Sequence, residues 1–269
     1  MGAGRLRLLR FAVRLPLVLL LLLGGLLILA VAYRWLPAAG RAWLNRNWSA
    51  CVLAISGVRV RVSGEPRLEG PVLWVANHVS WIDIFALSTV RATAFVAKAE
   101  IRRWPLAGWL AAGTGTVFIQ RGQRHAVHAA AAAMQRYFDQ GGAVGLFPEG
   151  TTSEGHDVRN FHASLFEPAR ELDVAVQPVA LRFLHHGRRS GYAAFVGEQT
   201  LVGNMWKVLG TTGLAVDVVF LPPLQVRGPD GAPASRTALA AASQEAIREV
   251  LVGEAQPAAQ EQRESALHA

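Results

Sequence analysis

The chain has 269 residues, of which 52% are apolar and 17% charged, and 27 Lys and Arg against 19 Asp and Glu give a formal net charge of +8. The apolar content excludes a largely disordered chain, and a single cysteine, Cys51, excludes an internal disulfide framework. A basic chain suits either nucleic acid or the anionic headgroups of a membrane. The sequence holds no zinc-finger spacing, RNA-recognition pattern or basic zipper, so we expect membrane lipids as partners and no nucleic acid.

The first predicted element is an uncharged, leucine-rich run at residues 15–33, bounded by Arg14 and Arg34. As a helix, this run is just long enough to cross a hydrocarbon core of about 30 Å. Three interpretations are open. The run is a transmembrane helix, a signal peptide with a cleavage-like site at residues 30–32, or one half of a membrane-dipping hairpin completed by the apolar stretch at 43–55.

Short apolar runs alternate with helical patterns through the rest of the chain. Strands are predicted at residues 58–63, 72–76, 116–120, 143–147, 174–184, 192–196 and 214–221, and helices at 81–90, 123–140 and 235–252. This alternation predicts an α/β fold with a mixed, mostly parallel sheet flanked by helices. The predicted organisation is a membrane-associated segment at 1–55, an α/β domain at 56–252 and a flexible polar tail at 253–269.

The segment 77–83, Asn-His-Val-Ser-Trp-Ile-Asp, follows a predicted buried strand. In open α/β sheets, functional residues gather at the carboxyl ends of strands. Here His78 can take a proton from a hydroxyl, and Asp83 can fix the tautomer of the histidine and stabilise its charged form. The same spacing is also compatible with a surface histidine followed by a carboxylate in the first turn of a helix.

A second polar segment, Phe-Pro-Glu-Gly-Thr-Thr-Ser at 147–153, also follows a predicted buried strand. Its glycine, hydroxyls and exposed amides can cradle an anionic group, although an ordinary turn has the same composition. No cluster of His, Cys, Asp or Glu has the spacing of a metal site, because His125 with His128 and the pair at 185–186 lack a third ligand. We therefore expect no metal and no tightly bound cofactor.

Taken together, the two segments resemble the motifs of the glycerolipid acyltransferase family, whose bacterial members include 1-acylglycerol-3-phosphate acyltransferases. Two further blocks agree with this resemblance: residues 98–121, which begin Lys-Ala-Glu-Ile and end Gly-Thr-Val-Phe-Ile-Gln-Arg, and residues 174–179, a strand with a proline. All four blocks occur in the family's order over about residues 70–185.

The resemblance implies a role for each matching residue. His78 would be the general base on the acceptor hydroxyl and Asp83 its orienting carboxylate, with no acyl-enzyme at Ser80. Arg121 would contact the phosphate or another anionic group of the acceptor, since a guanidinium binds phosphate through two parallel hydrogen bonds. The remaining substrate-binding candidates are Asn77, Lys98, Glu149, Gly150, Thr151 and Thr152.

One position departs from the pattern. Relatives that act on lysophosphatidate commonly carry Arg where this chain has Thr152, while the Gly-Thr-Thr-Ser form with Phe-His-Ala-Ser-Leu-Phe at 161–166 resembles relatives that acylate lyso-ornithine lipid. Arg159 is a candidate for the missing charge. We expect 1-acylglycerol 3-phosphate as the leading acceptor, lyso-ornithine lipid as the alternative, and a non-catalytic lipid-binding protein as a second alternative.

The acyl donor implied by the resemblance is acyl-CoA or acyl carrier protein, both of which are soluble cytosolic thioesters. This donor favours an uncleaved N-terminal segment and a location at the inner membrane with the site facing the cytoplasm. Arg102 to Trp104 and Trp109 are expected near the headgroups, although packing in the core is an equal alternative for Trp109.

Overall fold

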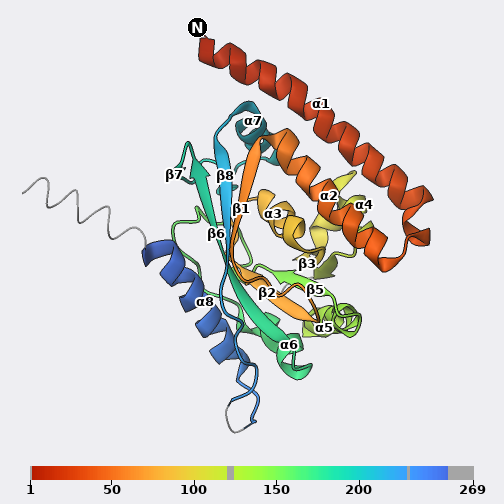
Figure 1. Ribbon diagram of the computed structural model, residues 1–269, viewed down its shortest axis with the longest axis vertical. Coiled ribbons are helices and arrows are strands. Elements are labelled where there is room, and N and C mark those ends of the chain that lie inside the picture. Colours follow the sequence, from red (N-terminus) through yellow and green to blue (C-terminus); the bar gives the residue numbers. More distant parts are fainter. Residues whose placement is uncertain (1, 120–123, 229–230, 254–269) are drawn as a thin grey trace, which may run out of the picture.

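The computed structural model describes residues 2–119, 124–228 and 231–253. Its centre is a single sheet with helices on both faces (Figure 1). The strands are β1 Val58–Gly64, β2 Val72–Ala76, β3 Thr93–Lys98, β4 Val117–Ile119, β5 Ala143–Leu146, β6 Ala175–His185, β7 Arg188–Arg189 and β8 Leu214–Phe220. The helices are α1 Gly2–Val31, α2 Ala38–Ser56, α3 Ile82–Val90, α4 Ala107–Gly113, α5 Arg124–Asp139, α6 Glu167–Glu171, α7 Leu201–Gly210 and α8 Arg236–Gly253, with short 3-10 turns η1 Tyr33–Trp35, η2 Ala99–Arg103 and η3 Ala163–Phe166.

The strand order is β1-β8-β6-β2-β5-β3-β4, with β7 paired to β6. β2 lies between β5 and β6 and runs parallel to both, and β3 and β4 continue the parallel part of the sheet. β8 is antiparallel to β6 and parallel to β1, which makes the sheet mixed. The predicted α/β fold with a mostly parallel sheet is confirmed.

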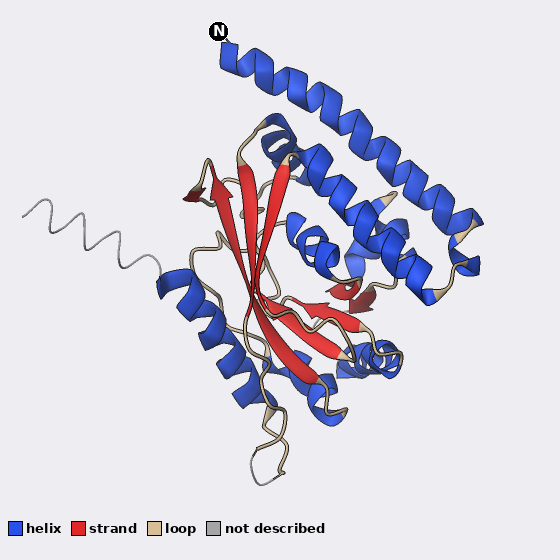
Figure 2. Cartoon of the chain, viewed as in Figure 1, coloured by secondary structure: helices blue, strands red, loops and turns tan. Residues whose placement is uncertain are grey.

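β2 is buried on both of its faces, as its unbroken apolar sequence indicates. Val72 and Trp74 point into a core shared with α2, α3 and α7, while Leu73 and Val75 point into a second core shared with α5, α6 and α8. Figure 2 shows the strands edge-on between α8 on one side and α2 with α3 on the other. The loop that follows β2 is therefore anchored by a strand with no exposed side.

The prediction of a strand at 192–196 is wrong. The backbone of this segment forms hydrogen bonds to loops instead of to a neighbouring strand. The Phe195 amide donates to Val79 O at 2.9 Å, and the Ala194 amide donates to Gly191 O at 3.0 Å. Ala193 and Ala194 are nonetheless almost completely buried, which explains the apolar composition. The sequence does not predict β3, β7, α4, α6 or α7, and α1 begins at Gly2, well before the predicted run at 15–33. The other predicted strands and helices agree with the structure to within a few residues.

The N-terminal helices α1 and α2 lie side by side and run in opposite directions (Figure 1). Trp48 of α2 donates through its indole Nε1 to Leu21 O of α1 at 3.2 Å, and its ring lies 5.6 Å from that of Phe85 in α3. Residues Gly4–Val31 form a helix long and apolar enough to cross a membrane. α1 and α2 together have the shape of a helical hairpin, which is the shape that the third of the N-terminal interpretations describes.

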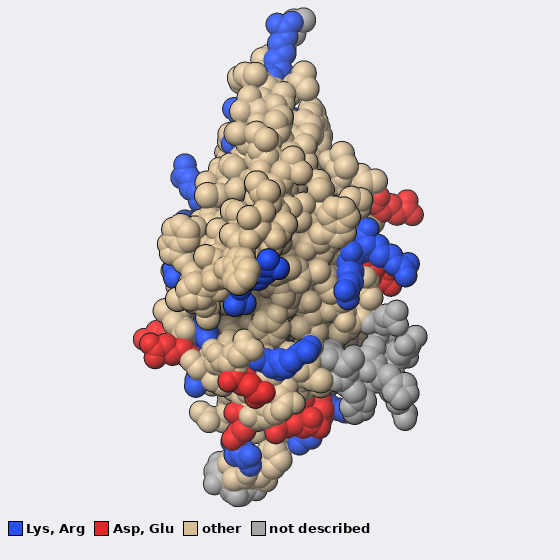
Figure 3. Space-filling model, turned by 90° about the vertical axis from the view of Figure 1, so that its right-hand side faces the viewer, with Lys and Arg blue, Asp and Glu red and all other residues tan. Residues whose placement is uncertain are grey.

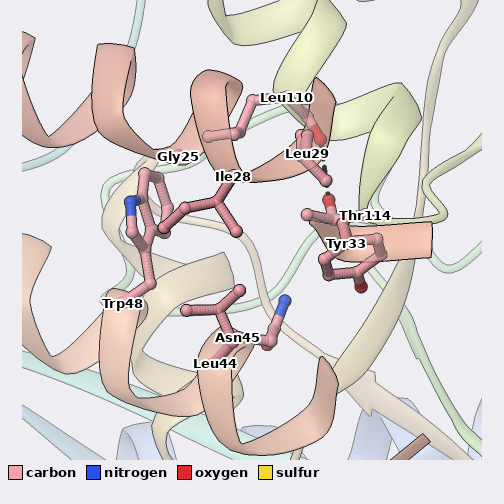
Figure 4. Close-up of a pocket in the computed structure, with 9 residues that line it drawn as sticks. All are labelled: Gly25, Ile28, Leu29, Tyr33, Leu44, Asn45, Trp48, Leu110 and Thr114. Atoms are coloured by element: carbon pink, nitrogen blue, oxygen red, sulfur yellow. Dashed lines mark hydrogen bonds between the residues drawn. The ribbon is translucent and has the colours of Figure 1, made fainter. Parts of the chain in front are cut away.

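A small apolar cavity of about 30 Å³ lies where α1, α2 and α4 meet (Figure 4). Asn45 is a polar residue in its wall, and its side-chain oxygen has no hydrogen-bond partner among the described residues. A space of this size holds one water molecule. The cavity contains none of the predicted site residues and is a gap in the packing of the hairpin.

The face built on the α1–α2 pair carries a broad uncharged area, interrupted by a few Lys or Arg side chains (Figure 3). The exposed large apolar residues on α1, η1, α2 and α4 are Leu6, Leu8, Leu9, Val13, Leu17, Leu19, Leu20, Leu23, Leu27, Val31, Trp35, Trp43 and Trp109. Soluble proteins rarely expose so many large apolar side chains together, and such a patch marks an interface with a membrane or a partner. Of the tail predicted at 253–269, residues 254–269 lie outside the described residues.

Candidate active site

The two predicted motifs meet at one edge of the sheet. The first follows Ala76 at the end of β2, and the second follows Leu146 at the end of β5. Because β2 and β5 are adjacent and parallel, with Val75 opposite Leu146, their carboxyl ends lie together. This edge is where open α/β sheets bind their ligands.

His78 and Asp83 form a hydrogen-bonded pair, with His78 Nδ1 2.8 Å from Asp83 Oδ2. Since a carboxylate only accepts, Nδ1 carries a proton, and in the neutral form of the histidine the lone pair is on Nε2. Asp83 is completely buried in the first turn of α3, and its Oδ2 also accepts the amides of Val79 at 2.7 Å and Ser80 at 3.0 Å. Three donors on one oxygen hold the carboxylate, and through it the histidine, in one orientation.

The ring of His78 is also held from the side. It stacks on Phe147 with the ring centres 4.2 Å apart and 15° between the planes, and Phe147 in turn lies parallel to Phe95. The side chain of His78 keeps 24% of its surface exposed, and Nε2 has no partner among the described residues. The geometry leaves Nε2 available to a proton donor that enters from outside.

Glu149 joins the two motifs through hydrogen bonds to the backbone. Its Oε1 accepts the amide of His78 at 2.8 Å, and its Oε2 accepts the amide of Arg159 at 3.1 Å. Burial raises the pKa of this carboxyl, while the two amides act in the opposite direction. Gly150 follows with φ of +72°, a left-handed conformation that other residues adopt at a cost, so the turn after Glu149 favours glycine.

The hydroxyl-bearing residues of the second motif differ in their surroundings. Thr151 is exposed, whereas the hydroxyl of Thr152 donates to Phe195 O. Ser153 donates its amide to His78 O at 2.7 Å. Thr152 and Ser153 thus bind the second motif both to the segment 192–196 and to the backbone beside the histidine.

The remaining predicted residues are Asn77, Lys98 and Arg121. Both polar atoms of the Asn77 side chain bind the backbone of Leu181 in β6, at 3.0 and 2.7 Å, and the residue is completely buried. Lys98 is exposed at the end of β3, level with Ile119 in β4, and so at the same edge of the sheet. Arg121 lies outside the described residues. The sequence reasoning missed Phe147 as the stacking partner of His78 and Phe195 as a link between the motifs.

Within the described part of the chain, no group of three His, Cys, Asp or Glu side chains could hold a metal ion. A polar hollow of about 220 Å³ lies between η2, β4 and α5, at the edge strand of the sheet. Arg102 and Arg136 line this hollow, together with Gly115, Thr116 and Tyr137. Two guanidinium groups at one hollow make it suited to an anion.

The chain resembles known proteins in both its sequence and its fold. Residues 59–182 match the sequence model of the family described as Acyltransferase. The chain is 40% identical over 220 residues to the lyso-ornithine lipid O-acyltransferase of Pseudomonas aeruginosa, covering 81% of each chain. It is 37% identical over 175 residues to the 1-acyl-sn-glycerol-3-phosphate acyltransferase of Neisseria meningitidis, covering 63% of this chain and 67% of that one.

A solved structure shares the fold. The crystal structure of the 1-acyl-sn-glycerophosphate acyltransferase from Thermotoga maritima matches 89% of this chain and 98% of its own with a TM-score of 0.57, at 22% sequence identity. The family match contains both motifs and the His78–Asp83 pair. With a relative aligned over four-fifths of its length, this chain belongs to the acyltransferase family.

Proposed function

We propose that this enzyme transfers a fatty acyl group from a thioester to the free hydroxyl of a lysolipid at the membrane, with lyso-ornithine lipid as the acceptor. The observation that carries the proposal is the His78–Asp83 pair, which leaves one ring nitrogen available at the carboxyl edge of the sheet. Relatives named for lyso-ornithine lipid and for 1-acylglycerol 3-phosphate both support the lysolipid class.

In the proposed reaction, Nε2 of His78 accepts the proton of the acceptor hydroxyl as its oxygen attacks the thioester carbonyl. The C–O ester bond forms, the C–S bond breaks, and the proton passes from the imidazolium to the leaving thiolate. Asp83 stabilises the imidazolium across the 2.8 Å hydrogen bond. No covalent acyl-enzyme is required, because the acceptor hydroxyl is itself the nucleophile.

The neighbouring residues have supporting roles in this proposal. Glu149 and Gly150 shape the loop beside the histidine, and Asn77 fixes the end of β2 against β6. Thr151 and Lys98, both exposed at the edge of the sheet, are proposed to contact the acceptor headgroup. Arg121, two residues beyond β4, is proposed as a further cation for an anionic group.

The choice of acceptor depends on Thr152. Its hydroxyl donates to Phe195 O, so this position presents no cation to a phosphate. The chain also aligns over 81% of its length with a relative named for lyso-ornithine lipid, against 63% with one named for 1-acylglycerol 3-phosphate. 1-Acylglycerol 3-phosphate is the second candidate, favoured by the exposed ammonium of Lys98 at the same edge.

The donor is proposed to be acyl-CoA or acyl carrier protein, whose phosphopantetheine arms both carry phosphate. The two arginines at the hollow beside β4 are a candidate contact for such a phosphate. Since these donors are cytosolic, we place the site on the cytoplasmic side of the inner membrane. The exposed apolar side chains of α1 and α2 support attachment to that membrane.

The test is thiol release by the purified full-length chain in mixed micelles, with lyso-ornithine lipid and 1-acylglycerol 3-phosphate compared at equal surface concentration. We expect faster release with lyso-ornithine lipid and an ester product in the mass spectrum. His78→Ala should abolish release, whereas His186→Asn, at an exposed left-handed turn after β6, should retain it.

Each other outcome has a distinct meaning. Wild-type release by His78→Ala would refute the proposed base. Faster release with 1-acylglycerol 3-phosphate would refute the acceptor but leave acyl transfer standing. Lysolipid binding without any thiol release would instead favour a non-catalytic lipid-binding protein of this fold.

A further inference from the structure

A buried asparagine on α7 connects the first site motif with the segment 192–196. Asn204 is completely buried in a helix whose other residues are mostly apolar. Its Oδ1 accepts the indole Nε1–H of Trp81 at 2.9 Å, and its Nδ2 donates to Ala194 O at 2.9 Å. A buried amide is costly unless it is hydrogen-bonded, so the structure retains a polar group here only with both ends engaged.

Both partners of Asn204 belong to the surroundings of the histidine. Trp81 lies in the first motif, directly after Ser80, whose amide binds Asp83. Ala194 precedes Phe195 in the segment 192–196, which we call the strap. Asn204 therefore ties the first motif and the strap to the same point on α7.

The strap contacts the backbone next to the histidine and also the second motif. The Phe195 amide donates to Val79 O at 2.9 Å, and Phe195 O accepts the hydroxyl of Thr152. Val79 also donates its own amide to Asp83 at 2.7 Å. The residue after His78 is thus held by the carboxylate at one end and by the strap at the other.

We infer that Asn204 is a positioning residue for acyl transfer: by fixing Trp81 and the strap together, it sets the orientation of the peptide between His78 and Asp83. The inference rests on the catalytic role proposed for this pair. Asn204 touches neither the histidine nor the reacting atoms, so its loss should lower kcat and leave the KM values for donor and acceptor nearly unchanged. Displacements of about 1 Å at a reacting centre can cost about 100-fold in rate.

The first variant is Asn204→Leu, which keeps the branched shape of the side chain, although with a larger volume, and removes both hydrogen bonds. We expect kcat to fall by about 10- to 100-fold, with each KM within about twofold of the wild type. The second variant is Trp81→Phe, which removes the same indole hydrogen bond from the other end and keeps an aromatic ring in place. It keeps the test decisive if Asn204→Leu fails to fold.

A double variant separates positioning from general destabilisation. If the two residues act through one contact, Asn204→Leu combined with Trp81→Phe should lower kcat by no more than the larger single change. The matched control is Thr200→Ala, which removes the side-chain cap of α7 to the Gly203 amide but leaves the bonds of Asn204 in place. It should lower the melting temperature with kcat unchanged below the transition.

Three results would overturn the inference. The first is a kcat of Asn204→Leu within twofold of the wild type, and the second is that the two single effects on kcat multiply in the double variant. The third is that Thr200→Ala loses as much kcat as Asn204→Leu when the two variants have lost the same amount of melting temperature. The failure of the proposed function is distinguishable from each of them. Activity in His78→Ala would refute the proposed function. If His78→Ala is inactive but Asn204→Leu keeps its activity, only the inference about Asn204 is refuted.

Discussion

Replacing Asp83 with Asn tests how the carboxylate supports the histidine. In the wild type, Oδ2 accepts three hydrogen bonds, from His78, Val79 and Ser80. The amide oxygen of Asn can keep all three only if its NH2 group takes the place of Oδ1, which is buried without a partner among the described residues. The opposite orientation would direct the NH2 group at two backbone N–H groups.

The magnitude follows from the change in charge. A hydrogen bond to a charged group stabilises by about 1.5–3 kcal/mol and a neutral one by about 0.5–1.5 kcal/mol. Three weakened bonds should together lower the free energy of unfolding by about 3–5 kcal/mol. The unpaired NH2 group adds no separate cost here, because it replaces an oxygen that is already unpaired. In the Ser-His-Asp triad the same change lowers kcat by about 10⁴-fold, and we expect a loss of about 10³-fold or more here.

The assay is thiol release at saturating donor and acceptor, with urea unfolding on the same samples. Asp173→Asn is a matched control, because Asp173 pairs with Arg227 at the surface and half of each side chain is exposed. Exposed pairs contribute little, so its stability should change by less than about 1 kcal/mol and its kcat not at all. A folded Asp83→Asn enzyme with kcat within tenfold of the wild type would refute the reasoning.

Three further changes test the surrounding framework. Burial raises the pKa of Glu149, so the unfolded chain loses this proton at a lower pH than the folded chain does. The free energy of unfolding should therefore fall as the pH rises from about 4.5 towards the raised value. Urea titrations at several pH values measure this slope, which Glu149→Gln should lack. Gly150→Ala places a side chain at φ of +72° and should destabilise by about 1–2 kcal/mol in thermal melts; an unchanged melting temperature would contradict the strain. Arg14→Leu removes two hydrogen bonds, to Leu209 O and Thr211 O, at the end of α7. It should lower the free energy of unfolding by about 1–3 kcal/mol in urea titrations. An unchanged free energy would show that α7 does not depend on these bonds.

Much of the sheet could be predicted because its central strand is buried on both faces. Val72 to Val75 form an unbroken apolar run, and a short run of this kind is typical of a strand that is covered on both faces. The strap at 192–196 shows the limit of that reasoning. Ala193 and Ala194 are buried as deeply as the residues of a strand, but the amides of the strap bind loops, and composition does not distinguish the two.

Part of the site could be predicted from the sequence, because two of its residues lie close together along the chain. His78 and Asp83 are five residues apart, so a local pattern predicts their pairing, and the structure shows it. The partners of Glu149 could not be predicted in this way, because its carboxylate binds the amide of a residue 71 positions away. Asn204 and Trp81 are 123 positions apart, and only the packing of α7 brings them together.

The way in which α1 lies along the domain limits how lipid can surround it. Arg14 binds the end of α7, Gly25 lies close against Trp48 of α2, and the side chain of Leu29 packs against Gly113 of α4. One side of the helix is therefore occupied by protein over most of its length. A helix in this position cannot be ringed by acyl chains unless the domain is drawn into the bilayer with it. A helix that keeps these contacts either lies at the membrane surface or takes the helices packed against it into the bilayer.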